Sequence, residues 1–152
     1  MTHWIDSWGT LNPTPCQESI DWAKTQPDWQ TAWNNCERGD WMLHRLARNM
    51  GEWGSPAHRK LVLAACQCAR LALPYVAEGE KRPLLAIELA ERWAKGEAIS
   101  REQLRNAADA AYTSDAAYAA YAAYASATAD AAHKKPLKEC ADIIRKAYPE
   151  AP

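Results

Sequence analysis

The sequence predicts an all-α protein: a single-domain bundle of six or seven helices, with a long Ala/Tyr-rich helix near the C-terminus. Helix-capping residues and prolines recur along the chain, the apolar residues between them follow helical spacing, and no segment alternates as a strand does. The chain has 152 residues, 48% of them hydrophobic, which is enough for one domain with a core. We expect a flexible N-terminal arm over residues 1–13, one helical domain over residues 14–148 and a frayed tail over residues 149–152.

Two short helices are expected in the first part of the domain. Thr14 is a suitable N-cap and Pro15 a suitable first helical residue, so a helix should begin here and end near residue 25. Asp28, which follows a proline, should cap a second helix that ends near residue 36.

Two further helices follow. Gly39 is expected to terminate the second helix, and Asp40 to cap a third over residues 41–50. Ser55 precedes a proline and should cap a fourth helix that ends at Pro74. Because the fourth helix is apolar on most of its sides, we expect it to lie at the centre of the bundle.

The remaining helices are predicted by spacing and by a capping box. Residues 83–96 carry an apolar stripe opposite a charged face, as in a helix half-covered by the core. Ser100 and Gln103 have the spacing of a capping box, and the helical pattern then continues to His133. Pro136 is expected to start the last helix.

An Ala-rich segment carries a marked residue at every third position. Fifteen of the 26 residues over 107–132 are Ala, so the helix should be stable with little packing. In one interpretation, the alanines pack on the body and the tyrosine hydroxyls reach water. In the other, the marked residues form a face that binds a partner, because Tyr supplies large rigid contact area. The residues of that face are Tyr112, Asp115, Tyr118, Tyr121 and Tyr124.

A second candidate binding face lies on the expected third helix. It consists of Trp41, His44, Arg45 and Arg48, which share one face by helical spacing. Trp and Arg are the commonest residues at binding hot spots, so this face could hold an acidic partner. The alternative is structural: Asp40 caps the helix, Arg45 pairs with a carboxylate of a neighbouring helix, and Trp41 belongs to the core.

Three other residues are expected to have structural roles. Arg59 and Arg70 lie about 20° apart in projection on the apolar fourth helix, so they should share a polar seam. A largely buried Arg needs a carboxylate, which the following Glu-rich helix can supply. Trp93 lies on the apolar stripe of that helix and is expected in the core.

The sequence indicates no catalytic, metal or cofactor site. Cys66 and Cys68 point apart on a helix, so they cannot share a metal ion. No glycine-rich phosphate loop, GxSxG, HExxH or paired-carboxylate motif is found. The five Cys are odd in number and irregularly spaced, which favours reduced thiols.

Charge and hydropathy bear on location and partners. The net charge of −1 argues against direct binding to nucleic acid or to an anionic membrane. Its distribution is uneven, however: residues 1–40 carry six acidic and two basic side chains, whereas residues 41–95 carry nine basic and five acidic ones. Such a dipolar surface suits a protein partner. With neither a signal peptide nor a membrane-spanning run expected, a cytoplasmic location is predicted.

Four segments of the chain resemble one family: residues 36–48 (CERGDWMLHRLAR), residues 59–97, the Ala/Tyr/Asp repeat and residues 139–152. This is the all-α immunity protein family of bacterial polymorphic toxin systems, whose relatives also occur in phage and prophage genomes. The similarity covers roughly residues 15–149 and includes a Gly-Asp-Trp turn at residues 39–41. It implies a cytosolic helical protein that neutralises an effector without catalysis. A net charge of −1 argues against a basic nuclease as that effector, because immunity proteins against such nucleases are strongly acidic.

Three functions follow as hypotheses. The first is a non-catalytic inhibitor that binds a toxin or a defence-system enzyme stoichiometrically. The second is a ligand- or nucleotide-binding module, or small enzyme, with an interhelical pocket formed by His44, Arg45, Arg48, Arg59 and Arg70. The third is a self-associating structural protein, such as a homodimer, with the Ala-rich helix as its seam.

Overall fold

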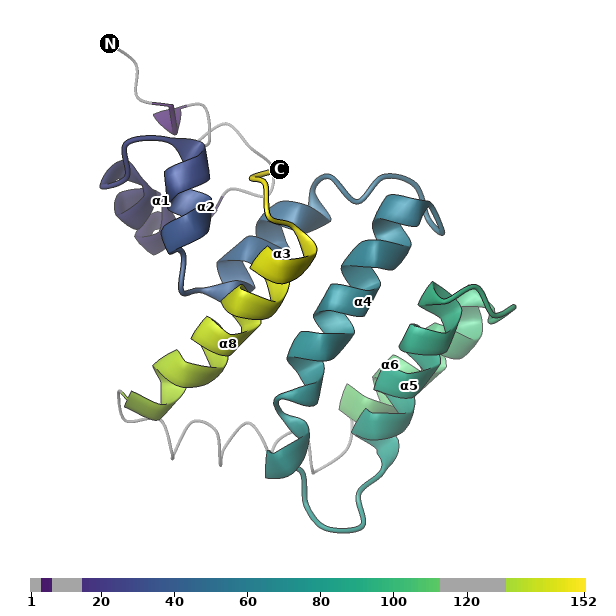
Figure 1. Cartoon of the computed structure of the whole chain (residues 1–152). Helices are drawn as coiled ribbons and strands as arrows, with labels where there is room; N and C mark the ends of the chain where they lie inside the picture. The colour runs from purple at the N-terminus through teal and green to yellow at the C-terminus, as the bar shows by residue number, and fades with distance from the viewer. Residues whose placement is uncertain (1–3, 7–14, 113–130) are drawn as a thin grey trace.

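The computed structural model describes residues 4–6, 15–112 and 131–152, and the regular elements in these ranges are all helical (Figure 1). The predicted all-α class is confirmed. In chain order the elements are α1 (Gln17–Lys24), α2 (Trp29–Asn35), α3 (Gly39–Ala47), α4 (Pro56–Arg70), the short 3₁₀ helix η2 (Leu73–Tyr75), α5 (Arg82–Ala94), α6 (Arg101–Tyr112) and α8 (Ala131–Ala147). Among the described helices, none combines the length and apolarity needed to cross a bilayer.

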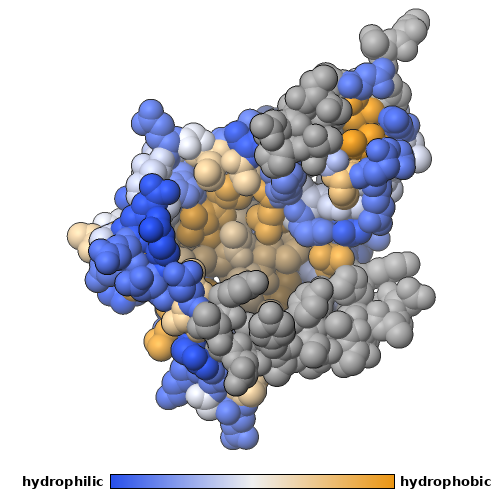
Figure 2. All heavy atoms as spheres, turned by 180° about the vertical axis from the view of Figure 1, so that it is seen from behind, coloured by the Kyte–Doolittle hydropathy of each residue, from blue (hydrophilic) through white to orange (hydrophobic). Residues whose placement is uncertain are grey.

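Helix α4 lies at the centre of the bundle, as its apolar sequence predicts. It packs against α5 on one side and against α3 and α8 on the other, and α6 lies against α5 (Figure 1). Helices α1 and α2 lie beside α3 and the C-terminal end of the chain (Figure 1), and Trp33 of α2 shares one core cluster with residues of α3, α4 and α8. From behind, the molecule shows an apolar hollow between hydrophilic rims (Figure 2).

Several helix starts agree with the capping residues in the sequence. The side chains of Asp28 and Ser55 each accept a hydrogen bond from the backbone N–H three residues later, at 2.7 and 3.1 Å. Ser100 and Gln103 form the complete reciprocal box: each backbone N–H donates to the other's side chain, at 2.8 and 3.1 Å. These contacts are local in sequence, which is why the sequence alone predicts them.

The start of α3 differs from the prediction. The helix already begins at Gly39, so Gly39 does not terminate the preceding helix and Asp40 is not the N-cap. Asp40 instead lies in the first turn and pairs with Arg38. A Cβ at position 39 would collide with Cys140 of α8, so this glycine permits the close packing of the two helices.

Two other helix boundaries also shift. Helix α1 begins at Gln17, after the N-cap residue Cys16, so Pro15 is not its first residue. Pro136 does not start the last helix but lies inside α8, which begins at Ala131. The expected long Ala/Tyr-rich helix falls largely on residues 113–130, which lie outside the described ranges.

Described residues near both ends of the chain contact the helical domain. Ile5 is 1% exposed and is one of the buried apolar residues. The expected frayed tail, residues 149–152, is held by α2. Trp29 donates its indole N–H to the carbonyl of Pro152 at 2.8 Å, and Ala151 donates its backbone N–H to Gln30 at 2.9 Å.

Candidate functional site

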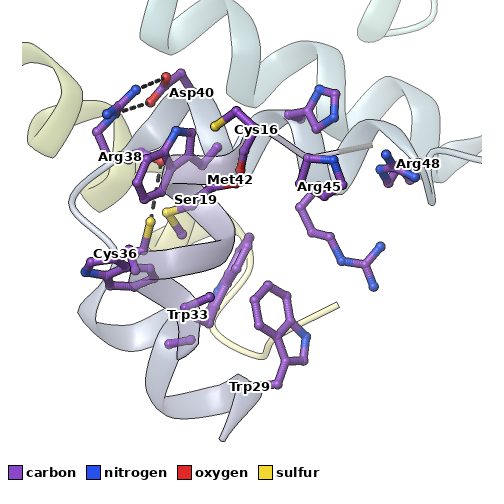
Figure 3. A pocket seen from close by; sticks show the side chains of 16 residues that line it. Cys16, Ser19, Trp29, Trp33, Cys36, Arg38, Asp40, Met42, Arg45 and Arg48 are labelled. Carbon is purple, nitrogen blue, oxygen red and sulfur yellow. Dashed lines mark hydrogen bonds and ion pairs between the residues drawn. The ribbon is translucent and has the colours of Figure 1, made fainter. Parts of the chain in front are cut away.

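A cavity of about 440 Å³ lies between α1, α2 and α3 (Figure 3). Four indole rings line it, and we call it the tryptophan pocket: Trp22 from α1, Trp29 and Trp33 from α2, and Trp41 from α3. The whole face predicted on the third helix, consisting of Trp41, His44, Arg45 and Arg48, also lines this cavity. The sequence-predicted face and the cavity are therefore one site.

The indole rings hold each other in place. Trp41 lies 5.9 Å from Trp22 between ring centroids, and Trp29 lies 5.7 Å from Trp33. Trp33 is fully buried, and its indole N–H donates to the carbonyl of Tyr148 at 2.8 Å. Trp41 packs against the core while lining the pocket, so its structural and binding interpretations are compatible.

Two arginines lie on one side of the pocket. Arg45 lies in the last turn of α3 and Arg48 is the residue that caps its C-terminus (Figure 3). The guanidinium carbon of Arg45 lies 5.7 Å from the ring centroid of Trp29, within the range of a cation–π contact. Burial lowers the pKa of Arg45, and the positive charge of Arg48 lowers it further. His44, the residue directly before Arg45, is exposed and also lines the pocket.

The other side of the pocket carries a compensated charge. Arg38 forms a two-pronged pair with Asp40, at 2.9 and 2.8 Å, and reaches Glu18 of α1 at 3.2 Å. Asp40 raises the pKa of Arg38 through these hydrogen bonds. The same guanidinium lies 4.3 Å from the ring centroid of Trp41. The pocket thus has an arginine–carboxylate cluster on one side and Arg45 and Arg48 on the other.

Two cysteines line the pocket, and the buried one, Cys36, is poorly suited to act as a nucleophile. Burial raises the pKa of Cys36, so its thiol stays protonated at neutral pH. Its sulfur lies 3.5 Å from the carbonyl oxygen of Arg38, to which the S–H donates. Within the described part of the chain, no group of three His, Cys, Asp or Glu side chains could hold a metal ion.

Of the residues predicted to be structural, Asp40 lines the pocket, whereas Arg59, Arg70 and Trp93 lie outside it. Arg70 pairs with Glu91 of α5 through two hydrogen bonds of 2.7 Å, which is the carboxylate partner expected for it. Arg59 donates instead to backbone carbonyls, those of Gly54 and Trp93, and lies 4.7 Å from the Trp93 ring. Trp93 is buried, as predicted. The interhelical pocket expected to include all five cationic residues therefore contains only those of α3.

The Ala/Tyr face lies outside the part of the chain that the structure describes. Asp115, Tyr118, Tyr121 and Tyr124 lie outside the described residues, and so does the side chain of Tyr112, the last residue of α6.

No family model, curated protein or solved structure matches this chain. The resemblance to immunity proteins therefore stays a hypothesis.

The sequence interpretation missed the α1 and α2 walls of the pocket. Trp29 and Trp33 are spaced i, i+4, and this spacing places both rings on one face of α2. Trp22 and Trp41 bracket that helix in the chain. This clustering of indoles was the available signal, but only the tertiary fold shows that they enclose a cavity.

Proposed function

We propose that this protein acts as a non-catalytic binding protein, and that the tryptophan pocket is its contact site for a partner protein. One observation carries the proposal: a face of Trp, His and Arg residues on α3 opens onto a cavity lined by three further indoles. Such side chains dominate the energetics of protein interfaces, above all where a pocket is already formed. The family resemblance supports a stoichiometric inhibitor, of the immunity type or directed by a phage against a host defence enzyme.

The chemistry of the pocket favours binding over catalysis. Asp40 is engaged by Arg38, and the raised pKa of Cys36 keeps its thiol protonated. The wall also carries Arg45 and Arg48, whose charge is permanent at neutral pH, together with Cys16, Ser19 and His44. Arginines of this kind can orient and neutralise an anion but do not exchange protons with it.

The proposal is tested by capture of the partner from the cells that produce the protein, or from phage-infected cells. The wild-type chain should retain one protein in stoichiometric amount, and the double variant Arg45→Glu/Arg48→Glu should lose it. The control is Lys95→Glu/Arg105→Glu, which changes net charge equally at exposed positions outside the pocket. Equal capture of the partner by the wild type and the pocket variant would show that the pocket is not the contact site.

A second candidate is a small anionic molecule, such as a nucleotide. The cavity volume of about 440 Å³ favours it, because small-molecule sites commonly measure ~300–1,000 Å³. Thermal unfolding with a panel of anionic metabolites tests it, since saturation a hundredfold above Kd adds about 2.7 kcal/mol to stability. No shift with any panel member would exclude this candidate.

A further inference from the structure

Two cysteines meet where α4 packs against α8. Cys68 is 8% exposed and lies on the core face of α4, on the same side as Leu61 seven residues earlier. Its Sγ lies 3.8 Å from the carbonyl oxygen of Cys140 on α8, to which the S–H donates. Cys140 is half-buried and packs against the same core cluster. Each of the two helices therefore contributes one free thiol to this contact.

The two thiols differ in reactivity. Cys140 is the more exposed one, so a small reagent reaches it first. A hydrogen bond from the Cys68 thiol lowers the pKa of Cys140, whereas the same hydrogen bond, together with burial, raises the pKa of Cys68. The thiolate is the form that attacks a disulfide, so Cys140 is the better nucleophile of the two. Cys68 lies beside it as a second thiol that can resolve an adduct.

Cys66 provides a matched comparison on the same helix. It is 7% exposed, so it is buried about as deeply as Cys68. Its Sγ lies 3.9 Å from the carbonyl oxygen of Ile87 on α5, because positions two apart on a helix point roughly 200° apart. Burial raises the pKa of Cys66 to about 11. Cys66 thus shares the helix and the burial of Cys68 but faces α5 instead of α8.

We infer that Cys68 and Cys140 are a redox-sensitive modification site, which forms a reversible disulfide between α4 and α8 by exchange with a low-molecular-weight disulfide such as oxidised glutathione. The Cys140 thiolate attacks one sulfur of the reagent and releases the other half as a thiolate, which leaves a mixed disulfide on Cys140. Cys68 then attacks the sulfur of Cys140, and the second half of the reagent leaves with the proton of Cys68. Two protein thiols are oxidised, and one external disulfide is reduced to two thiols.

The bond would hold the bundle closed. It joins residues 72 positions apart, and the loop between them contains α5 and α6. A cross-link of this span restricts the unfolded chain more than the folded one. It also lies where Cys140 faces Gly39, the first residue of α3. Oxidation should therefore stabilise the packing of α3, α4 and α8 and raise the midpoint of thermal unfolding.

Exchange with oxidised glutathione tests the inference on the intact protein. The reduced protein is incubated with oxidised or with reduced glutathione, and the remaining free thiols are alkylated after acid quenching and unfolding. Mass spectrometry of a non-reduced tryptic digest should show residues 61–70 linked to residues 139–145 only after oxidised glutathione. The exposed Cys16 is the internal control, since its uptake of glutathione shows that the reagent is active. Uptake by Cys16 without the cross-link would overturn the inference.

Single variants assign the bond, because residues 61–70 contain both Cys66 and Cys68. Cys66→Ser should keep the cross-link. Cys68→Ser should instead retain glutathione on Cys140 as a mixed disulfide, and Cys140→Ser should form no cross-link. Thermal unfolding in reduced glutathione shows whether each variant is folded, and Cys68→Ala replaces Cys68→Ser if the hydroxyl prevents folding. A cross-link that is lost in Cys66→Ser, or kept without Cys68, would overturn the inference.

The midpoint of thermal unfolding shows whether the bond belongs to the folded protein. The oxidised wild type should unfold about 10 °C above the reduced wild type, and dithiothreitol should reverse the shift. In Cys140→Ser the midpoints after oxidised and reduced glutathione should coincide. An oxidised wild type with an equal or lower midpoint would show that the bond forms only by distorting the packing of α4 and α8, and would overturn the inference.

Discussion

Gly39 shows how one missing side chain positions the site. It is the first residue of α3 and faces Cys140 of α8 so closely that a Cβ would collide with the Cβ of Cys140. Trp41 and Arg45 follow on the same helix, so the contact at Gly39 helps to fix the angle at which they enter the pocket. Glycine often terminates a helix, so the sequence suggested a terminator at position 39. In the structure, a glycine at this position instead allows the close packing of α3 against α8.

Substitution of Gly39 by Ala tests this packing through the sign of its effect. In an unconstrained helix, Gly→Ala stabilises by roughly 0.5–1 kcal/mol. Here the added methyl group collides with α8, and overpacking should lower the free energy of unfolding by about 1–3 kcal/mol. Urea denaturation of wild type and Gly39→Ala measures the difference. A higher free energy of unfolding for Gly39→Ala than for the wild type would show that α3 and α8 can move apart to accept the methyl group without loss of stability.

Among the helices, sequence-based prediction succeeded where the contacts are local. Asp28, Ser55 and Ser100 cap their helices as expected, because each cap involves residues three apart. Asp40 is not the predicted cap, since α3 begins one residue earlier at Gly39, which packs against Cys140 of α8 about 100 positions away. The same limit applies to the pocket: helical spacing predicted its α3 wall, but no local pattern places α1 and α2 opposite that wall.

The contact between α4 and α5 gives a testable dependence on pH. Hydrogen bonds from Arg70 lower the pKa of Glu91 below its ordinary value of 4.5. The unfolded chain then takes up this proton at higher pH than the folded chain, so the contribution to stability is present above about pH 4.5 and is lost as pH falls through the folded-state pKa. Arg70→Gln should therefore lose less stability on acidification than the wild type.

Thermal unfolding between about pH 6 and pH 3 measures this difference. Arg105→Gln, an exposed position on α6, is the control and should follow the wild-type profile. Parallel profiles for wild type and Arg70→Gln would mean that the ion pair does not persist in solution.

In the whole molecule, both ends of the chain converge on α2. Trp4 lies 5.8 Å from Trp29 between ring centroids, and the carbonyl of Pro152 accepts from the same Trp29 indole. The hydrogen bond joins residues 123 positions apart, so no local pattern in the sequence predicts it. Because Trp29 also lines the tryptophan pocket, the order of the tail and the shape of the site are linked.

Release of the tail by Gln30→Ala tests this link without shortening the chain. The substitution removes both hydrogen bonds between Gln30 and residues 149–152, so the amide hydrogen of Ala151 should exchange with solvent about tenfold faster or more. The indole signal of Trp29 should shift in the NMR spectrum, because its ring loses a fixed neighbour. Gln17→Ala is the matched control, since Gln17 contacts only Asp21 on its own helix among the interactions described for it. Faster exchange at Ala151 with an unchanged Trp29 signal would mean that the tail moves independently of the pocket. An unchanged exchange rate at Ala151 would show that the two indole–carbonyl hydrogen bonds hold the tail without Gln30.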